Sequence, residues 1–457
     1  MTIDAALTEL STFLGNRLSR SKSDLDLHGA NETYFPLTPP DAVAYPETTA
    51  EVAGIATICA RHGCPEVGWG TGTSLEGHAL AFQGGVSVDF SRMNKVLEVH
   101  AQDMDVVVQP GLTREELNTE LRATGLFFSV DPGANASLGG MAMTRASGTT
   151  AVRYGTMRDN VRGLEVVLAG GRVIRTGTRA RKSSAGYDLT GLMVGSEGTL
   201  GLVTELTLKL HGVPEAVSAA VCAFPDMGAA VDAVIATIQM GVPMARIEFV
   251  DPNMAAAFNL YAGAHFPEAP HLMVEFHGSD ASVAEDVARF REIAEEFGAG
   301  GFDWATKPED RTALCKMRHK SHCASHARRP GARVLVTVIC VPISRLAEAV
   351  EETRKDIAAA SFPGTILGHV GDGNFHAELM FDETDAGERA EAMRLSERMV
   401  ERALRLGGTS TGEHGIGVGK LDYMAAEHGP AWGVMGDIKR ALDPGNIMNP
   451  GKVVRLN

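Results

Sequence analysis

Two histidines flank a glycine-rich segment, GHVGDGNFH, in which His369 and His376 stand seven residues apart. On a continuous strand this spacing would point the two rings to opposite faces, and glycines within one turn disfavour a helix. Asp372-Gly373 is typical of a two-residue type I′ hairpin turn. Such a turn would place His369 directly opposite His376, with Cβ atoms roughly 5 Å apart. We therefore expect a hairpin that presents two imidazoles to one metal ion.

Another pair of chemically active residues, Glu413 and His414, lies in the segment TSTGEHGIG. Two imidazoles and one carboxylate can form a three-ligand metal site that keeps positions open for substrate. Neighbouring side chains can face one site only where the backbone is irregular, and the flanking Gly412 and Gly415 permit this. Zinc suits two histidines and one glutamate, and manganese or iron could occupy the same ligands.

A rival histidine cluster occurs in RHKSHCASHA, where the histidines have helical spacing. It contains no carboxylate at helical spacing, which disfavours a metal site. We interpret His319, His322 and His326 as a polar helix face.

Two glycine-rich segments could approach a ligand closely. GWGTGTSLEG lacks the Lys-Ser/Thr ending of a P-loop, and a strand beginning near Val86 follows it instead of the helix that a Rossmann loop requires. Its backbone N–H groups and hydroxyls could bind pyrophosphate, but a surface turn is an equally good interpretation of this segment alone. Residues 131–160 are rich in small residues, which suits close approach of the backbone to a ligand.

Composition narrows the class of protein. The 457 residues contain 44% hydrophobic residues and carry a net charge of −15, which indicates folded domains and disfavours a nucleic-acid partner. The six cysteines show no CxxC pair and are expected to be reduced thiols. The N-terminus lacks a basic region before an apolar core, and no apolar run is long enough to span a bilayer. We therefore expect a cytoplasmic protein without a membrane span.

The secondary structure pattern indicates an α+β protein with at least two domains. The first 214 residues read as strands, a helix capped by Thr113 with Glu116 in a capping box, and a hairpin around Gly170-Gly171. From about residue 215, helices alternate with strands such as ARIEFVD, HLMVEFHG and RVLVTVICVP, a pattern of helices on an antiparallel sheet. We expect domains at residues 1–214 and 215–424, and a C-terminal segment at 425–457.

Several long motifs carry a family resemblance over residues 37–453. DPGANASLGGMAMTRASGTTAVRYGTMRDNVRGLEVVLAGG and KSSAGYDLTGLMVGSEGTLGLVTELTLKL resemble the FAD-binding module of the vanillyl-alcohol oxidase / p-cresol methylhydroxylase superfamily. GHVGDGNFH, STGEHGIGVGK and LDPGNIMNPGK resemble its FAD-dependent D-lactate and D-2-hydroxyacid dehydrogenase branch. The resemblance implies a two-subdomain FAD-binding module, a substrate (cap) domain carrying the metal site, and a C-terminal segment that packs back on the FAD domain.

The resemblance also implies roles for individual residues. It makes His369, His376 and Glu413 the metal ligands, His414 the base and Arg318 the partner of the substrate carboxylate, a group that a guanidinium binds with two parallel hydrogen bonds. The sequence departs from the family pattern at His78, where glycine is expected and which we interpret as an ordinary polar residue, and at Val338, where aspartate is expected. The residues implied in FAD binding are Gly70, Thr71, Gly72, Thr73, Ser74, Gly77, Pro132, Ser137, Gly139, Gly140, Ala146, Ser147, Gly148, Tyr154, Gly155, Gly198, Val203 and Asn449.

The function that the resemblance implies is FAD- and metal-dependent oxidation of a small D-2-hydroxy acid, with D-lactate as the leading substrate. The alternatives are the same chemistry on D-2-hydroxyglutarate or glycolate, a non-redox metallohydrolase that shares the His-His-Glu pattern, and a flavoprotein without a substrate of its own. A flavin dehydrogenase also needs an electron acceptor, which would be a cytochrome, a quinone or an electron-transferring flavoprotein.

Overall fold

The computed structural model describes residues 2–31, 33–305 and 321–456. Its chain divides into two compact units, and the first expected domain boundary, at 214, lies next to a boundary of this division. The expected boundary at 424 lies twelve residues after the observed change of unit at Gly412. Unit 1 consists of Met1–Ser147, Gly155–Val213 and Glu413–Asn457, and unit 2 of Gly148–Tyr154 and Pro214–Gly412.

Unit 1 begins with a small sheet in the order β1-β2-β4-β3, in which β2, β4 and β3 are parallel. Helix α3 crosses between β2 and β3; it starts where the Thr48 side chain accepts a hydrogen bond from Glu51 N–H and ends at Gly63 in a left-handed conformation. The helices and strands of this part are α1 (Ile3–Leu14), β1 (Leu18–Ser19), α2 (Lys22–Gly29), β2 (Ala42–Ala44), α3 (Thr49–His62), β3 (Glu66–Trp69) and β4 (Val86–Asp89).

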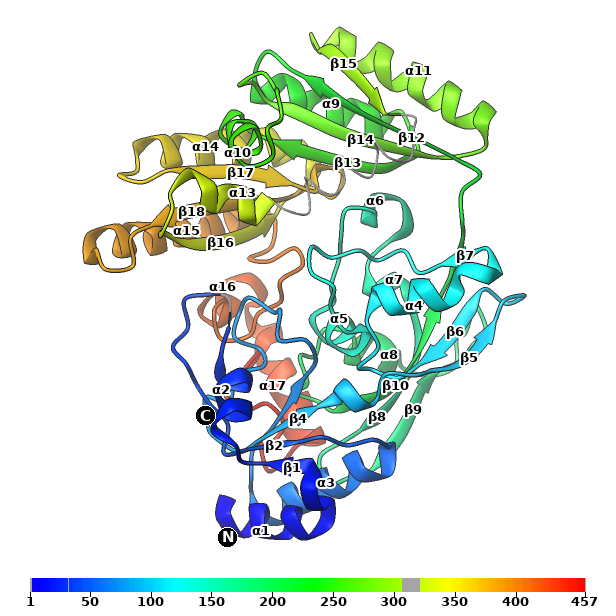
Figure 1. Cartoon of the computed structure of the whole chain (residues 1–457), viewed down its shortest axis with the longest axis vertical. Coiled ribbons are helices and arrows are strands. Elements are labelled where there is room, and N and C mark those ends of the chain that lie inside the picture. Colours follow the sequence, from blue (N-terminus) through cyan, green and yellow to red (C-terminus); the bar gives the residue numbers. More distant parts are fainter. Residues whose placement is uncertain (1, 32, 306–320, 457) are drawn as a thin grey trace. The chain divides into compact units, whose positions relative to one another are not determined.

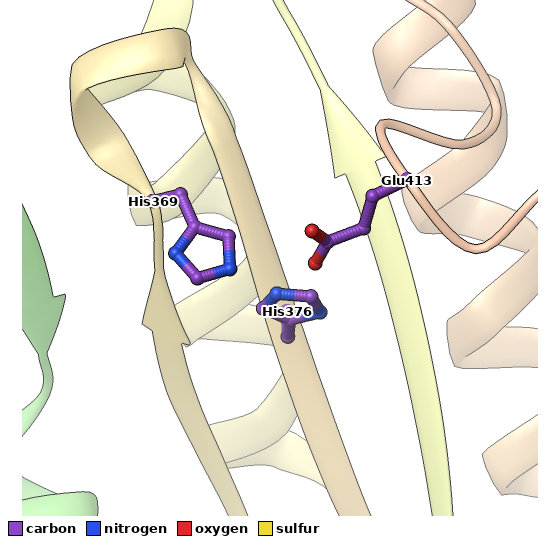
Figure 2. Close-up of side chains that lie close together, drawn as sticks. All are labelled: His369, His376 and Glu413. Atoms are coloured by element: carbon purple, nitrogen blue, oxygen red, sulfur yellow. The ribbon is translucent and has the colours of Figure 1, made fainter. Parts of the chain in front are cut away.

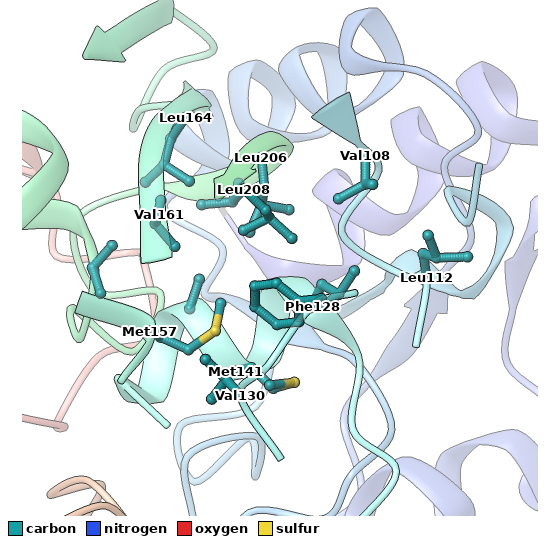
Figure 3. Packing of buried hydrophobic residues seen from close by; sticks show 14 of the residues in the cluster. Val108, Leu112, Phe128, Val130, Met141, Met157, Val161, Leu164, Leu206 and Leu208 are labelled. Carbon is teal, nitrogen blue, oxygen red and sulfur yellow. The ribbon is translucent and has the colours of Figure 1, made fainter. Parts of the chain in front are cut away.

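A second sheet of unit 1 is antiparallel, in the order β5-β6-β10-β8-β9. Apolar residues from its strands and from the following helices form one buried core, part of which is shown in Figure 3 around Phe128, Met141 and Leu206. The elements are β5 (Val96–His100), β6 (Asp105–Val108), α4 (Arg114–Glu120), β7 (Leu126–Phe127), α5 (Leu138–Thr144), α7 (Met157–Asn160), β8 (Val161–Val167), β9 (Val173–Gly177), α8 (Leu189–Met193), β10 (Leu202–Lys209) and β11 (His211–Gly212).

The C-terminal part of the chain completes unit 1. It contains α16 (Met424–His428) and α17 (Pro430–Leu442), and after α17 the backbone forms a parallel bridge between Met448 and Glu66 of β3. The buried Lys439 of α17 donates to the carbonyl of Thr199 at 2.8 Å. The C-terminal part therefore packs back on the earlier parts of unit 1.

Unit 2 is built on one antiparallel sheet of seven strands, in the order β15-β12-β14-β13-β17-β18-β16. Helices α9, α11, α14 and α15 contact one another along the sheet, and α10 and α13 form a separate contacting pair (Figure 1). The elements are α6 (Ala151–Tyr154), β12 (Ala216–Ala223), α9 (Met227–Gln239), β13 (Met244–Val250), α10 (Pro252–Ala262), β14 (His271–Gly278), α11 (Asp280–Glu296), β15 (Gly300–Ala305), α13 (Ser321–Arg328), β16 (Arg333–Cys340), α14 (Leu346–Ala359), β17 (Gly364–Gly368), β18 (Asn374–Phe381) and α15 (Ala386–Arg405).

Two local expectations, the capping box and the glycine hairpin, are confirmed. Thr113 and Glu116 form the capping box of α4, and β8 and β9 pair as a hairpin whose turn contains Gly170 and Gly171, both at positive φ. The cysteines that the structure describes, all but Cys315, are free thiols. Among the described residues, no helix combines the length and the apolar character needed to cross a bilayer. The fold is thus the α+β class that the sequence indicated.

Candidate active site

The histidine hairpin forms, but not with the expected turn. β17 and β18 pair with Leu367 opposite His376, so His369 leaves the ladder and does not face His376 across it. A type I′ turn needs positive φ at both central residues. Here Asp372 ends a short 3₁₀ turn that starts at Val370, and only Gly373 is left-handed, at φ 75°. The two-residue turn was therefore a wrong prediction.

The two imidazoles nevertheless come together. The ring centroids of His369 and His376 lie 5.5 Å apart with the planes at 89°. The ligand atoms of both rings and of the Glu413 carboxylate all lie within 4.8 Å of one another. Figure 2 shows the three side chains converging. Both histidines are buried.

The approach of Glu413 depends on the four residues before it. Thr409 forms an isolated bridge with Cys340 of β16, within unit 2. A Cβ atom on Gly412 would lie 2.2 Å from Asn374 Oδ1, so only glycine allows this backbone to come so close. Glu413 and His414 follow on an irregular segment, as the flanking glycines suggested, with His414 Nε2 3.8 Å from Glu413 Oε1.

This donor set fits a divalent metal. It combines two imidazoles and a carboxylate, the ligands typical of catalytic zinc sites. His369 is also held from behind, because its Nδ1 lies 2.6 Å from the buried Glu248 carboxylate. A carboxylate behind a ligating histidine is the usual outer partner of a metal ligand.

The structure describes only part of the rival histidine cluster and of its surroundings. Arg318 and His319 lie outside the described residues. His322 and His326 share one side of α13 with ring centroids 4.8 Å apart. His322 Nδ1 lies 4.0 Å from the Glu378 carboxylate.

A buried carboxylate, Glu197, holds the chain directly after His414. Its two oxygens accept hydrogen bonds from the N–H groups of Ile416 at 2.6 Å and Gly417 at 2.8 Å. Burial alone would raise the pKa of Glu197, but His78 and the two N–H groups outweigh it and hold this pKa below its usual value. His78 Nε2 lies 3.3 Å from Glu197, so the residue that departs from the family pattern belongs to a buried polar network.

The same network contains predicted cofactor residues. The Asn449 amide donates to the carbonyls of Glu197 at 2.6 Å and His78 at 3.0 Å. Lys452 donates to the Asn449 side chain and to the carbonyl of Leu80, and burial lowers the Lys452 pKa to about 7. Gly77 and Gly198 are the chain neighbours of His78 and Glu197, and both have positive φ. The predicted residues Gly77, Gly198 and Asn449 therefore lie together in unit 1.

The two predicted cofactor loops also meet within unit 1. A Cβ on Gly70 would lie 2.1 Å from Ser137 Oγ, and a Cβ on Gly140 would lie 3.0 Å from the same atom. Gly72 has φ 71° and its Cβ would lie 2.5 Å from the Trp69 ring. These glycines let the two loops and the Trp69 ring pack closely against one another. The first loop also carries the hydroxyls of Thr71, Thr73 and Ser74 and a run of backbone N–H groups, the donors that bind a pyrophosphate, so the residues present fit a dinucleotide.

The other predicted FAD residues are distributed as follows. Gly139 packs on Pro110, whose carbonyl accepts its N–H at 2.8 Å. Val203 is buried on β10. Thr71 is exposed, and its hydroxyl lies 3.2 Å from that of Thr73. Of the remaining predicted residues in unit 1, Ala146 is buried, and the following are partly exposed: Thr73, Ser74, Pro132, Ser147 and Gly155.

Gly148 and Tyr154 belong to unit 2 rather than to unit 1. The Tyr154 hydroxyl lies 2.7 Å from His277 Nδ1, and His277 Nε2 lies 2.6 Å from Glu275 Oε1. Burial is the main cause of the raised pKa of Tyr154. The predicted flavin-binding segment is thus shared between the two units of the chain.

Sequence reasoning missed Glu197 and Glu248. Glu248 stands between two buried apolar residues in ARIEFVD, and a carboxylate inside an apolar strand is a signal that it has a partner. Glu197 sits in GSEGTLG at φ 54°, a conformation uncommon for a residue other than glycine, which only the structure reveals.

Comparisons with known proteins agree with this architecture. Residues 40–177 match the family model "FAD binding domain", and residues 213–453 match "FAD linked oxidases, C-terminal domain". Among solved structures, p-cresol methylhydroxylase with substrate bound has a TM-score of 0.80 at 19% identity, covering 98% of this chain and 96% of that chain. This likeness confirms the fold.

Three curated relatives are similar over most of their length. Probable mitochondrial D-lactate dehydrogenase of Danio rerio is 49% identical over 94% of this chain and 87% of the relative. Mitochondrial D-lactate dehydrogenase (cytochrome) of Arabidopsis thaliana is 44% identical, covering 98% and 80%. Glycolate oxidase subunit GlcD of Bacillus subtilis is 34% identical, covering 91% and 89%.

These matches correct the expected location of the protein and identify its family. The cytoplasmic location was wrong, because the first two relatives are named as mitochondrial proteins. The match of both FAD domain models contradicts the non-redox metallohydrolase. The chain has the fold of p-cresol methylhydroxylase, belongs to the FAD-linked oxidases, and is a flavin-dependent dehydrogenase related to the D-lactate dehydrogenases.

Proposed function

We propose that this enzyme oxidises D-lactate to pyruvate, and that His369, His376 and Glu413 hold a divalent metal, with zinc preferred over manganese or iron. The observation that carries the proposal is the convergence of these three side chains within 4.8 Å, next to His414. The names of the Danio rerio and Arabidopsis thaliana relatives support D-lactate as the substrate.

The reaction breaks two bonds of the substrate, the hydroxyl O–H bond and the Cα–H bond. The hydroxyl proton passes to an imidazole nitrogen of His414, because histidine is the side chain best suited to accept a proton near neutral pH. Bound FAD would supply the two-electron hydride acceptor that this oxidation requires, and the substrate C–O bond would become the carbonyl of pyruvate. His369, His376 and Glu413 would hold a divalent metal, which would supply the positive charge that stabilises a developing alkoxide. We assign Arg318 to the substrate carboxylate.

The chain's own residues would hold these groups in place. Glu197 fixes the backbone after His414 through Ile416 and Gly417. The FAD residues that we propose are the two glycine loops of unit 1, the Gly148 and Tyr154 segment, and the Gly77, Gly198 and Asn449 group. A cytochrome is the electron acceptor that the name of the Arabidopsis thaliana relative favours.

The test is reduction of the bound flavin without oxygen. The purified holoenzyme is mixed with D-lactate, L-lactate, glycolate or D-2-hydroxyglutarate, and loss of the oxidised flavin absorbance is followed. We expect D-lactate to bleach the flavin fastest. Glycolate is the second candidate substrate, because the Bacillus subtilis relative is named a glycolate oxidase subunit. No bleaching by any of these acids would refute the proposed reaction.

The metal part has its own test. Elemental analysis should find stoichiometric metal in the wild type, and His369→Ala or His376→Ala should lower bound metal and activity while FAD remains. His322→Ala is the matched control, because His322 lies in the rival cluster of the same unit. An active wild type without stoichiometric metal, or an active double variant of His369 and His376, would remove the metal from the proposal.

A further inference from the structure

We infer that Glu248 is a positioning residue that orients the imidazole of His369 for metal binding. The inference rests on the proposed function, because it assumes that His369 is a metal ligand. Glu248 is 2% exposed, and its Oε1 lies 2.6 Å from His369 Nδ1. No family description or relative's name assigns a role to this carboxylate.

The sheet register explains why Glu248 meets His369. β13 and β17 are antiparallel neighbours, with Val250 opposite Leu367 and Phe249 opposite Gly368. Continuing this register by one residue brings Glu248 opposite His369, at the point where the chain leaves the strand for the 3₁₀ turn. The backbone pairing that ends at Phe249 and Gly368 therefore brings Glu248 to His369.

The backbone around the pair is tightly packed. A Cβ on Gly368 would lie 2.5 Å from both the Asn374 carbonyl oxygen and the Phe375 Cα, and a Cβ on Gly371 would lie 2.5 Å from the Ile247 side chain. The main chain that carries His369 thus has little room to shift. What remains to be fixed is the rotation of the imidazole and its tautomer.

The hydrogen bond to Glu248 fixes both the rotation and the tautomer of the His369 imidazole. A carboxylate oxygen accepts, so His369 Nδ1 carries the hydrogen and donates it to Glu248. In the neutral ring this leaves Nε2 without a hydrogen, which is the form of imidazole that binds a metal. The ring lies with its plane at 89° to that of His376, and Figure 2 shows both rings beside the Glu413 carboxylate. A carboxylate behind the ligand also increases the basicity of the ligating nitrogen.

A second glutamate–histidine pair in the same sheet provides the contrast. Glu275 Oε1 lies 2.6 Å from His277 Nε2. The other nitrogen of His277 bonds the Tyr154 hydroxyl at 2.7 Å, so both ring nitrogens are engaged by protein groups. The Glu275–His277 pair joins Tyr154 and lies outside the cluster of His369, His376 and Glu413, so it serves as the matched control for Glu248.

The experiment measures zinc affinity. Holoenzyme is freed of metal with a chelator, FAD content is checked, and Zn²⁺ binding is measured by competition with a chromophoric chelator. Loss of such an outer carboxylate typically weakens metal affinity 10- to 100-fold. We expect about 100-fold for Glu248→Ala and about 10-fold for Glu248→Gln, whose oxygen still accepts a hydrogen bond. Glu275→Gln, the matched control, should bind zinc like the wild type.

FAD content and the unfolding temperature of the metal-free protein distinguish positioning from folding. Both should be alike in Glu248→Gln and Glu275→Gln, while only the former loses zinc affinity. Wild-type affinity in Glu248→Gln would overturn the inference and leave the proposed function intact. If Glu248→Ala does not fold, Glu248→Gln decides alone. A wild type that binds no zinc, manganese or iron would overturn both the inference and the metal part of the proposed function.

Discussion

Replacing Glu197 with glutamine should loosen the segment that carries His414. The carboxylate accepts one hydrogen bond on each oxygen, from the N–H groups of Ile416 and Gly417. The glutamine amide has one oxygen and one NH₂ group, so it can accept from only one of the two. The second backbone N–H would then face the NH₂ group of the glutamine, which is also a donor, so it would lose its hydrogen bond beside a buried side chain.

The magnitude follows from that lost bond. A hydrogen bond to a charged group contributes about 1.5–3 kcal/mol, and each 1.4 kcal/mol corresponds to about tenfold in an equilibrium. Hydrogen exchange at Ile416 or Gly417 should therefore become roughly 10- to 100-fold faster in Glu197→Gln. Reduction of the flavin by D-lactate should slow by at least about tenfold, because a misplacement of about 1 Å can cost 10²-fold in rate.

Exchange followed by mass spectrometry and stopped-flow reduction test the two parts separately. Glu165→Gln is the control, since Glu165 is also buried in unit 1 but bonds the hydroxyls of Thr49 and Thr204. Unchanged exchange at both amides would refute the anchoring role of Glu197. Faster exchange with a wild-type reduction rate would remove Glu197 from the positioning of His414.

Three further predictions concern the cofactor, the base and pH. Gly72→Val should lower FAD content, because Gly72 has φ 71° and its Cβ would meet the Trp69 ring at 2.5 Å; full flavin content, measured by absorbance, would contradict this placement. His414→Asn should keep FAD and slow its reduction by roughly 10²–10⁴-fold, and an unimpaired variant in stopped flow would exclude His414 as the base. Burial, aided by Asp443, raises the Glu66 pKa to about 8 from the usual 4.5. The protonated form is therefore favoured in the folded state, so this stabilisation is complete below about pH 4.5 and is lost as the pH rises through 8. Glu66→Gln should gain thermal stability over the wild type between pH 5 and 8.5, and a pH-independent difference in unfolding temperature would contradict this.

The sequence predicted those features that depend on local patterns. The strands β13, β14 and β16 and their alternation with helices follow from hydrophobic spacing, and the capping box at Thr113 follows from two residue types. The convergence of His369, His376 and Glu413 was also expected from residue types and family resemblance. These features need little knowledge of the rest of the chain.

What could not be predicted depends on pairing between distant strands. The hairpin turn was misjudged because Asp-Gly favours type I′ locally, whereas in the fold a Cβ on Gly373 would lie 2.1 Å from the Val341 carbonyl, and Asp372 stays in a 3₁₀ turn. Glu248 meets His369 only through the register of β13 on β17, which involves residues about 120 positions apart. The location was wrong because the features of the N-terminus do not specify a compartment.

The division of unit 1 into three pieces has a consequence for its synthesis. Lys439, Asn449 and Lys452 are buried in unit 1, where they bond groups that were translated more than 200 residues earlier. At roughly 5–20 residues per second, the ribosome needs about 10–50 s to make the residues from Pro214 to the end. During that time the incomplete unit 1 exposes the positions that this segment later fills, while nearly all of unit 2 is already available to fold. Chaperone binding to nascent chains should therefore be strongest before residue 452 emerges, and the loops proposed to hold FAD close around it last.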